Sequence, residues 1–262
     1  MSNNIQSKYF YGGVSDVGYM RERNEDFLAF EVLREDILLA VVADGAGSRQ
    51  CGFEIQPAVI AATEIVGVVK RFFTSNPEFL EKYPIEVLNE AMAVANRTIG
   101  VFKVANEDLY SGFGVCATCC LVIGEKFFFA HCGNTRLYMV RHLQDDSARI
   151  LQLTNDHTLA ARMVKDGTLN AEEYYSHPSR NTYTSGLGFV DTPEIQTYSA
   201  TLKKGDLLAL TTDGIHYAIN PESIKNIILE SDGWESAANA LISGAKMREM
   251  VDNMTAAIIY YL

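Results

Sequence analysis

Five acidic residues in four short blocks are the residues of this sequence best suited to chemistry. Each block lies beside an apolar run and has the form of a turn at the end of a strand. In chain order the blocks contribute Glu25 with Asp26, then Asp44, Asp213 and Asp252. Because carboxylates are unfavourable to bury without a compensating cation, their delivery by apolar runs predicts a metal site.

Carboxylates with almost no histidine among them favour the hard cations Mg²⁺ and Mn²⁺ over zinc. Two such ions held about 3.5–4 Å apart can generate a hydroxide and stabilise both oxygens of an in-line displacement at phosphorus. Arg21, four residues before Glu25, would add a planar two-pronged donor for a phosphoryl group. Gly45 and Gly47 would let the backbone beside Asp44 approach the ions closely.

The elements that must position these residues alternate in type without a repeated strand–helix–strand period. Apolar runs predict strands at 27–33, 37–44, 115–123, 126–132, 135–141, 148–154, 195–202, 206–212 and 254–262. Helical patterns are predicted near 54–73, 84–104, 157–167, 221–231 and 233–247. This order, with tight turns between several strands, fits helices packed outside a sandwich of two sheets.

Length and composition predict one globular domain. A chain of 262 residues, 48% hydrophobic and 21% charged, can form one core with an insertion, for which the polar stretch 155–192 is the candidate. The net charge of −11 disfavours nucleic acid as a partner. The start of the chain lacks a signal-like pattern and no apolar run approaches about 18–20 residues, so we expect a cytoplasmic protein with no membrane partner.

The five cysteines predict buried thiols. Four of them cluster, and residues 116–120 contain a CxxC, but no second pair follows at zinc-ribbon spacing and the run is apolar and strand-like. His131 and His157 lie outside the acidic blocks, so we expect them to form structural hydrogen bonds. For Arg136 we expect electrostatic support of a strand end and no catalytic role.

The ordered set of blocks resembles a known family. RERNED, ADGAGS, the run from Ser111 to Val140, LTNDHT, TTDGI and DNMT have the order and approximate spacing of the motifs of the metal-dependent protein serine/threonine phosphatases, the PPM or type 2C family. The likeness runs from about Val14 to Ile259 and is greatest to bacterial single-domain members. It implies an α+β fold, a four-layer α-β-β-α sandwich of two antiparallel sheets flanked by helix pairs. Residues 1–262 would be one catalytic domain, with 157–192 as an inserted flap.

The resemblance also implies a role for each candidate residue. Asp44 would bridge two Mn²⁺ or Mg²⁺ ions, with the Gly45 carbonyl and Glu25 completing one ion. Asp213 and Asp252 would complete the other.

Two further residues would act on water and on the substrate. Asp26 would orient metal-bound waters and Arg21 would hold the substrate phosphate. A water that bridges the ions would attack phosphorus directly, without a phosphoenzyme.

The chain departs from the family pattern at three positions. Asn134 and Tyr217 stand where many relatives have aspartates associated with a third, weaker metal, so we expect that site to be weak or absent. Ala46 stands where some eukaryotic relatives have a histidine proposed as general acid. Water or another residue, for which His216 is a candidate, would then protonate the leaving group.

These features predict a Mn/Mg-dependent hydrolase of phosphoserine and phosphothreonine on proteins, acting in signalling. Its partners would be phosphorylated proteins, among them a Ser/Thr kinase or the targets of one. Two alternatives are a pseudophosphatase that binds phosphoproteins without turnover and a small-molecule phosphoesterase. A two-metal nuclease is disfavoured by the negative charge. No motif identifies the physiological substrate.

Overall fold

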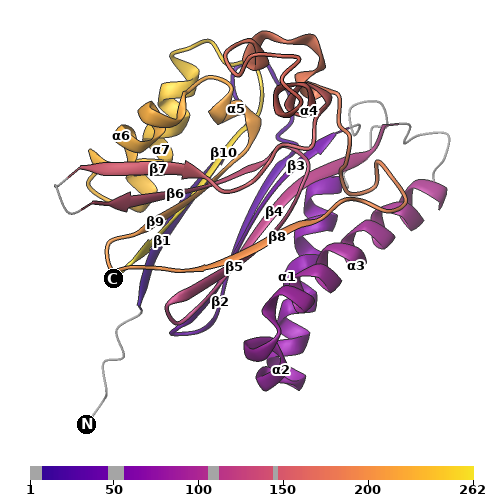
Figure 1. Cartoon of the computed structure of the whole chain (residues 1–262). Coiled ribbons are helices and arrows are strands. Elements are labelled where there is room, and N and C mark those ends of the chain that lie inside the picture. The colour runs from indigo at the N-terminus through magenta and orange to yellow at the C-terminus, as the bar shows by residue number, and fades with distance from the viewer. Residues whose placement is uncertain (1–7, 47–55, 106–111, 144–146) are drawn as a thin grey trace.

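The computed structural model describes residues 8–46, 56–105, 112–143 and 147–262. Within them, ten strands form two five-stranded sheets whose paired strands are all antiparallel. Figure 1 shows helices packed on the outer side of each sheet. The predicted α+β sandwich of two antiparallel sheets flanked by helices is therefore confirmed.

The first sheet has the strand order β1-β10-β9-β6-β7. Its strands are β1 (Tyr9–Asp16), β10 (Met254–Tyr261), β9 (Leu207–Thr211), β6 (Arg136–His142) and β7 (Ala148–Gln152). The second sheet has the order β2-β3-β4-β5-β8. Its strands are β2 (Asp26–Arg34), β3 (Ile37–Ala46), β4 (Gly114–Ile123), β5 (Lys126–Cys132) and β8 (Gln196–Thr201).

The alternation of β3 explains why the molecule has four layers. Successive side chains of a strand point to opposite faces, and β3 is apolar on both. Ile37, Leu39 and Val41 pack into the core beneath the helices of the second sheet. Leu38 and Val42 pack into the core between the two sheets. A strand buried on both faces appears in the sequence as a continuous apolar run, which is why β3 could be predicted.

The helices of the second sheet each begin at a proline. They are α1 (Pro57–Ser75), α2 (Pro77–Lys82) and α3 (Pro84–Ala105). Proline suits a first helical turn because the N–H that it lacks has no partner there. The Asn76 side chain accepts a hydrogen bond from the Phe79 N–H and so caps α2.

The first sheet is covered by three helices that follow β9. These are α5 (Asp213–His216), α6 (Pro221–Leu229) and α7 (Trp234–Lys246). Leu241 of α7 and Ile224 of α6 join Ile258 of β10 in a separate buried cluster. In the part of the chain that the structure describes, no helix is both long and apolar enough to cross a bilayer.

The segment 157–192 contains three short helices. They are α4 (Leu159–Lys165), η2 (Glu173–Ser176) and η3 (Pro178–Asn181). In Figure 1 this segment lies at the end of the sandwich where α5 begins. That it is an inserted flap within a single domain stays a prediction.

Candidate metal centre

Asp26 and Asp44 lie opposite each other on neighbouring strands. Asp26 is the first residue of β2, and the antiparallel register pairs it with Asp44 near the end of β3. The Asp26 carboxylate accepts hydrogen bonds of 2.8 Å from the hydroxyls of Thr212 and Thr255. Thr212 follows β9 and Thr255 lies in β10, so one buried carboxylate joins the second sheet to the first.

Asn253 fixes the two loops that carry Glu25 and Asp252. Its side-chain oxygen accepts a 2.9 Å hydrogen bond from the Glu25 N–H, and its amide donates to the carbonyls of Val17 and Arg23 at 2.9 Å each. Asp252 is the preceding residue. The loop before β2 is therefore bound to the loop before β10.

Gly45 lies against the same loop. Its N–H donates to the Glu25 carbonyl at 3.1 Å. A Cβ at Gly45 would approach that carbonyl oxygen to 2.9 Å, so a side chain here would force the two strands apart. This close approach brings the Asp44–Gly45 backbone beside Glu25, as the metal-site prediction requires.

The charges of the other four acidic residues all act on Asp44. Burial raises the pKa of Asp44 well above its ordinary value, and the charges of Asp213, Asp26, Asp252 and Glu25 raise it further. Burial also raises the pKa of Asp26 to about 7, although the hydrogen bonds from Thr212 and Thr255 lower it. For Asp213, burial and secondly the Asp252 charge raise the pKa to about 7. Carboxylates this close to one another need positive charge to remain ionised.

Two arginines supply part of that charge. Arg21 donates from Nη2 to Asp252 Oδ2 at 2.7 Å, while its buried Nε has no hydrogen-bond partner among the described residues. Arg21 and Arg180 both lower the pKa of Asp213. Arg21 thus lies in the predicted site and keeps a donor for an anionic ligand.

The donor set fits hard divalent cations. All five side chains offer oxygen, and the Gly45 N–H holds the Asp44–Gly45 backbone against Glu25. Among the described residues no three acidic, histidine or cysteine side chains are gathered closely enough to hold one ion by themselves. Mg²⁺ and Mn²⁺ do not require such a cage, because Mg²⁺ in particular keeps several waters and takes only one or two carboxylates.

Asn134 and Tyr217 form a polar bridge beside Asp213. The Asn134 amide donates to Asp213 Oδ2 at 3.2 Å and to the Tyr217 hydroxyl at 3.3 Å. The Tyr217 hydroxyl donates to the Arg180 carbonyl at 3.2 Å and lies 3.3 Å from that of Tyr174. The two residues predicted to weaken a third metal site therefore connect Asp213 to η2 and η3.

The histidines have structural surroundings. His131 Nδ1 lies 2.9 Å from the Thr118 hydroxyl and its Nε2 3.0 Å from the Asn155 carbonyl, while His157 Nδ1 accepts from a backbone N–H at 3.2 Å. Both histidines therefore form the structural hydrogen bonds that were predicted for them. His216 is buried, and burial holds its pKa well below the ordinary value, so it is neutral near pH 7. A neutral imidazole in this state carries no acidic proton to give to a leaving group.

The cysteines have no part in the site chemistry that the sequence predicts. Cys116, Cys119, Cys120 and Cys132 are buried and free of disulfides, as expected. Burial raises the pKa of each thiol, which keeps it protonated and unreactive. Gly47 and Cys51 lie outside the described residues.

Several residues that hold the site were not predicted. Thr212, Asn253 and Thr255 lie inside or next to the blocks TTDGI and DNMT, so their position was a usable signal. Arg180 comes from a polar stretch with no distinguishing pattern. Only the fold brings it near Asp213.

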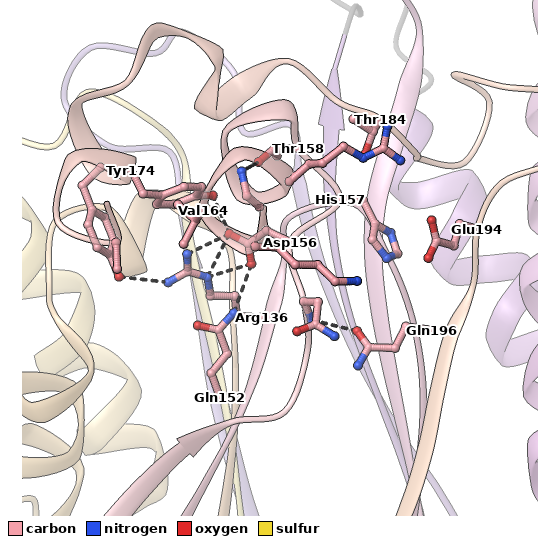
Figure 2. Close-up of a pocket in the computed structure, with 16 residues that line it drawn as sticks. Arg136, Gln152, Asp156, His157, Thr158, Val164, Tyr174, Thr184, Glu194 and Gln196 are labelled. Carbon is pink, nitrogen blue, oxygen red and sulfur yellow. Dashed lines mark hydrogen bonds and ion pairs between the residues drawn. The ribbon is translucent and has the colours of Figure 1, made fainter. Parts of the chain in front are cut away.

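A separate pocket lies beside the candidate centre. This cavity of about 570 Å³ is lined by residues of α4, of η2 and of the ends of β7 and β8, and the five acidic residues are not among them. Figure 2 shows Arg136 and Asp156 joined within it, with Nη2 and Oδ2 2.7 Å apart. This buried ion pair is the electrostatic support expected of Arg136, which is the first residue of β6.

Comparison with known proteins gives a consistent match. A family model described as "Protein phosphatase 2C" matches residues 19–258. "Protein phosphatase PhpP" of Streptococcus pneumoniae is 25% identical over 248 residues, which cover 94% of this chain and 95% of that protein. "Serine/threonine phosphatase stp" of Listeria monocytogenes is 24% identical over 246 residues, covering 94% and 93%.

Solved structures share the fold. The serine/threonine phosphatase of S. agalactiae superposes with a TM-score of 0.83 at 25% identity, covering 97% of this chain and 100% of that one. The catalytic domain of PstP, solved in complex with two manganese ions, superposes with a TM-score of 0.77 at 22% identity, covering 97% and 98%.

Proposed function

Because the chain belongs to the protein phosphatase 2C family, we propose that it hydrolyses phosphoserine and phosphothreonine on proteins with two Mn²⁺ or Mg²⁺ ions as cofactors. The observation that carries this proposal is the convergence of Glu25, Asp26, Asp44, Asp213 and Asp252 at one end of the sandwich. Manganese bound in the PstP structure makes Mn²⁺ the first cation to test.

The proposed ligand set follows the five acidic residues. Asp44 would hold both ions, Glu25 and the Gly45 carbonyl would hold one, and Asp213 with Asp252 would hold the other. When bound, the two cations supply a nucleophile at neutral pH and neutralise the phosphoryl oxygens.

The remaining groups bind and orient. Asp26 is held as an acceptor by the Thr212 and Thr255 hydroxyls, so its carboxylate is fixed for orienting water. Arg21 offers its unpaired Nε to a phosphoryl oxygen while Nη2 stays on Asp252. A planar guanidinium can make both contacts at once, which places the phosphate next to the metal ligands.

The test is manganese-dependent release of phosphate from a phosphothreonine peptide. We expect Asp44→Asn and Asp213→Asn each to lower the rate by more than about a hundredfold, since loss of even a supporting group costs about 10–100-fold. Asp191→Asn changes an exposed carboxylate and should leave the rate unaltered. Normal turnover by either site variant would mean that the ligand assignment is wrong.

The same assay separates the alternatives. A pseudophosphatase would bind the phosphopeptide without releasing phosphate, and a small-molecule phosphoesterase would prefer a free phosphate ester to the peptide. We also propose that a third ion binds weakly or not at all, because the Asn134 amide already donates to Asp213. Which kinase or kinase target supplies the phosphoprotein, and the cytoplasmic location, stay predictions.

A further inference from the structure

Exposed apolar side chains border the candidate metal centre on two loops. One loop joins β1 to β2 and the other joins α7 to β10. We call the following residues the apolar rim, with their exposed fractions: Val17 36%, Tyr19 74%, Met20 71%, Met247 79% and Val251 54%. A group of large apolar side chains left in water marks a surface that binds another molecule.

The two loops form one continuous surface. The Asn253 amide donates to the Val17 carbonyl at 2.9 Å. Gly18 lies directly against the other loop, since a Cβ there would approach the Asp252 carbonyl oxygen to 2.6 Å. Lys246 Nζ lies 5.0 Å from the centre of the Tyr19 ring. The two loops that carry the rim are therefore neighbours in space, although more than two hundred positions of the chain separate them.

The end of α7 holds its half of the rim in a defined turn. Glu249 has φ +57°, the left-handed conformation that commonly ends a helix. The Met250 N–H donates to the Ala245 carbonyl at 3.3 Å, which closes the turn. Met247 and Val251 lie on either side of Glu249, so their backbone positions are fixed without contact to a bound molecule.

Arg21 lies inside this surface. It directly follows Met20 in the chain and is bonded to Asp252, which directly follows Val251. The proposed phosphate-binding group thus has rim residues on both sides. A protein that presents a phosphorylated residue to Arg21 must lay the neighbouring residues of its chain on or beside the rim, because each extended residue advances only about 3.3 Å.

We propose that the apolar rim binds the substrate polypeptide beside its phosphorylated residue and selects apolar side chains there. This inference rests on the proposed function and adds a substrate preference to it. The preference comes from apolar burial: covering about 50 Å² of rim and peptide surface favours binding by about tenfold.

The experiment compares two phosphothreonine peptides of equal length and charge. One has leucine or valine at the two positions on each side of the phosphothreonine, and the other has serine or asparagine there. We expect the wild-type enzyme with Mn²⁺ to show a kcat/KM about tenfold higher on the apolar peptide, mainly through KM. Two double variants remove half of the rim each: Tyr19→Ser/Met20→Ser and Met247→Ser/Val251→Ser. In both, the ratio of kcat/KM on the apolar peptide to kcat/KM on the polar peptide should fall toward one, while turnover of para-nitrophenyl phosphate stays unchanged.

A matched control comes from α3. Val101 and Val104 are 71% and 78% exposed and lie on the helices of the other sheet, so Val101→Ser/Val104→Ser should keep the wild-type preference. Equal kcat/KM for both peptides in the wild type, or a preference that both rim variants keep, would overturn the proposal. A rim that instead joins two copies of this chain would show as a dimer in sedimentation that the rim variants dissociate, and this result also overturns it.

Binding separates failure of this proposal from failure of the proposed function. The affinities of the same peptides with a non-hydrolysable phosphonate in place of the phosphate need no turnover. A protein that releases no phosphate but binds the apolar peptide about tenfold more tightly, with the preference lost in the rim variants, supports the rim and refutes the hydrolase. Turnover without any preference refutes the rim alone.

Discussion

At the scale of single residues, the neutral pair Asn134 and Tyr217 is the most distinctive feature of the centre. The Asn134 amide uses its donors on Asp213 and on Tyr217, so a lone pair of Asp213 is already occupied. A cation at that position would have to displace the amide and would gain only a neutral oxygen. These contacts support the proposal that a third ion binds weakly or not at all.

The prediction is that two acidic replacements create the missing site. Asn134→Asp/Tyr217→Asp adds two carboxylates near Asp213 and removes the donor, so calorimetric titration with Mn²⁺ should show one more bound ion than in the wild type. Asn134→Gln/Tyr217→Phe is the uncharged control and should gain none. A third well-occupied ion in the wild type itself would contradict this reasoning.

His131 makes the folded protein sensitive to acid. Burial lowers its pKa from 6.5 to about 3. The folded state therefore favours the neutral ring, and the resulting stability is complete above pH 6.5 and is lost as the pH falls toward 3. The unfolded chain takes up the proton first, so between pH 6.5 and 5 this residue alone should lower the free energy of unfolding by about 2 kcal/mol.

Urea unfolding at several pH values measures this effect. His131→Gln should be less stable than wild type at pH 7.5, because the ring contacts with Thr118 and Asn155 are lost, yet its stability should fall less between pH 6.5 and 5. Parallel curves for the two proteins over that range would show that His131 does not titrate as stated.

At the scale of elements, sequence patterns predicted the strands buried on both faces and missed β1 and α2. The YFYGGVSD run of β1 contains Gly12 and Gly13, which weaken a strand pattern. In the structure a Cβ at Gly12 would approach the Glu235 nitrogen to 2.6 Å, and one at Gly13 the Leu28 side chain to 2.5 Å. Gly12 therefore allows β1 to pack closely against α7, and Gly13 allows it to pack closely against β2. These are tertiary contacts, which a local sequence pattern does not contain.

The same limit applies to α2 and to the candidate centre. The helical patterns predicted from the sequence stop near residue 73 and resume at 84, whereas in the structure Asn76 caps α2 between them. The acidic residues could be found because each lies next to a recognisable apolar run. Tyr217 and Arg180 become neighbours only when η3 packs against the residue that follows α5, so their contacts could not be inferred from local sequence.

Tyr217 is expected to hold η2 and η3 in place. Its hydroxyl has contacts with Asn134, Tyr174 and the Arg180 carbonyl, and the Arg180 guanidinium lies 4.7 Å from the centre of its ring. In Tyr217→Phe the ring packing remains while the hydroxyl contacts are lost. Hydrogen exchange of residues 173–181 should become about tenfold faster, as expected for the loss of about 1.4 kcal/mol of local stability.

Tyr175→Phe is the matched control for that experiment. Tyr175 lies in η2 and its ring contacts that of Tyr217, but among the described residues its hydroxyl accepts a hydrogen bond only from Arg136, at 3.5 Å. Exchange in this control should stay near the wild-type rate. Equal acceleration in both variants would show that the helix is loosened by any lost hydroxyl, and would remove the special role of Tyr217.

At the scale of the whole molecule, the candidate centre lies where the two sheets meet. Asp26 and Asp44 come from one sheet, while Asp213 follows β9 and Asp252 precedes β10 of the other. Their mutual repulsion opposes closure of the sandwich at this end, since burial and neighbouring charges disfavour the ionised forms. Cations that bound here would bind only the folded chain and would therefore stabilise the whole molecule.

Thermal unfolding at pH 8 tests this coupling through two opposite shifts. Mn²⁺ at about 100 times its dissociation constant should stabilise the wild type by about 2.7 kcal/mol per site, which raises Tm by about 5–10 °C.

Without metal, Asp213→Asn should unfold at the same or a higher temperature than wild type. The reason is that a carboxyl with its pKa raised to about 7 destabilises the folded state fully above that pH. The variant should gain much less from Mn²⁺. If it were less stable than wild type without metal and equally stabilised with it, Asp213 would be a structural residue and the centre would have to be sought elsewhere.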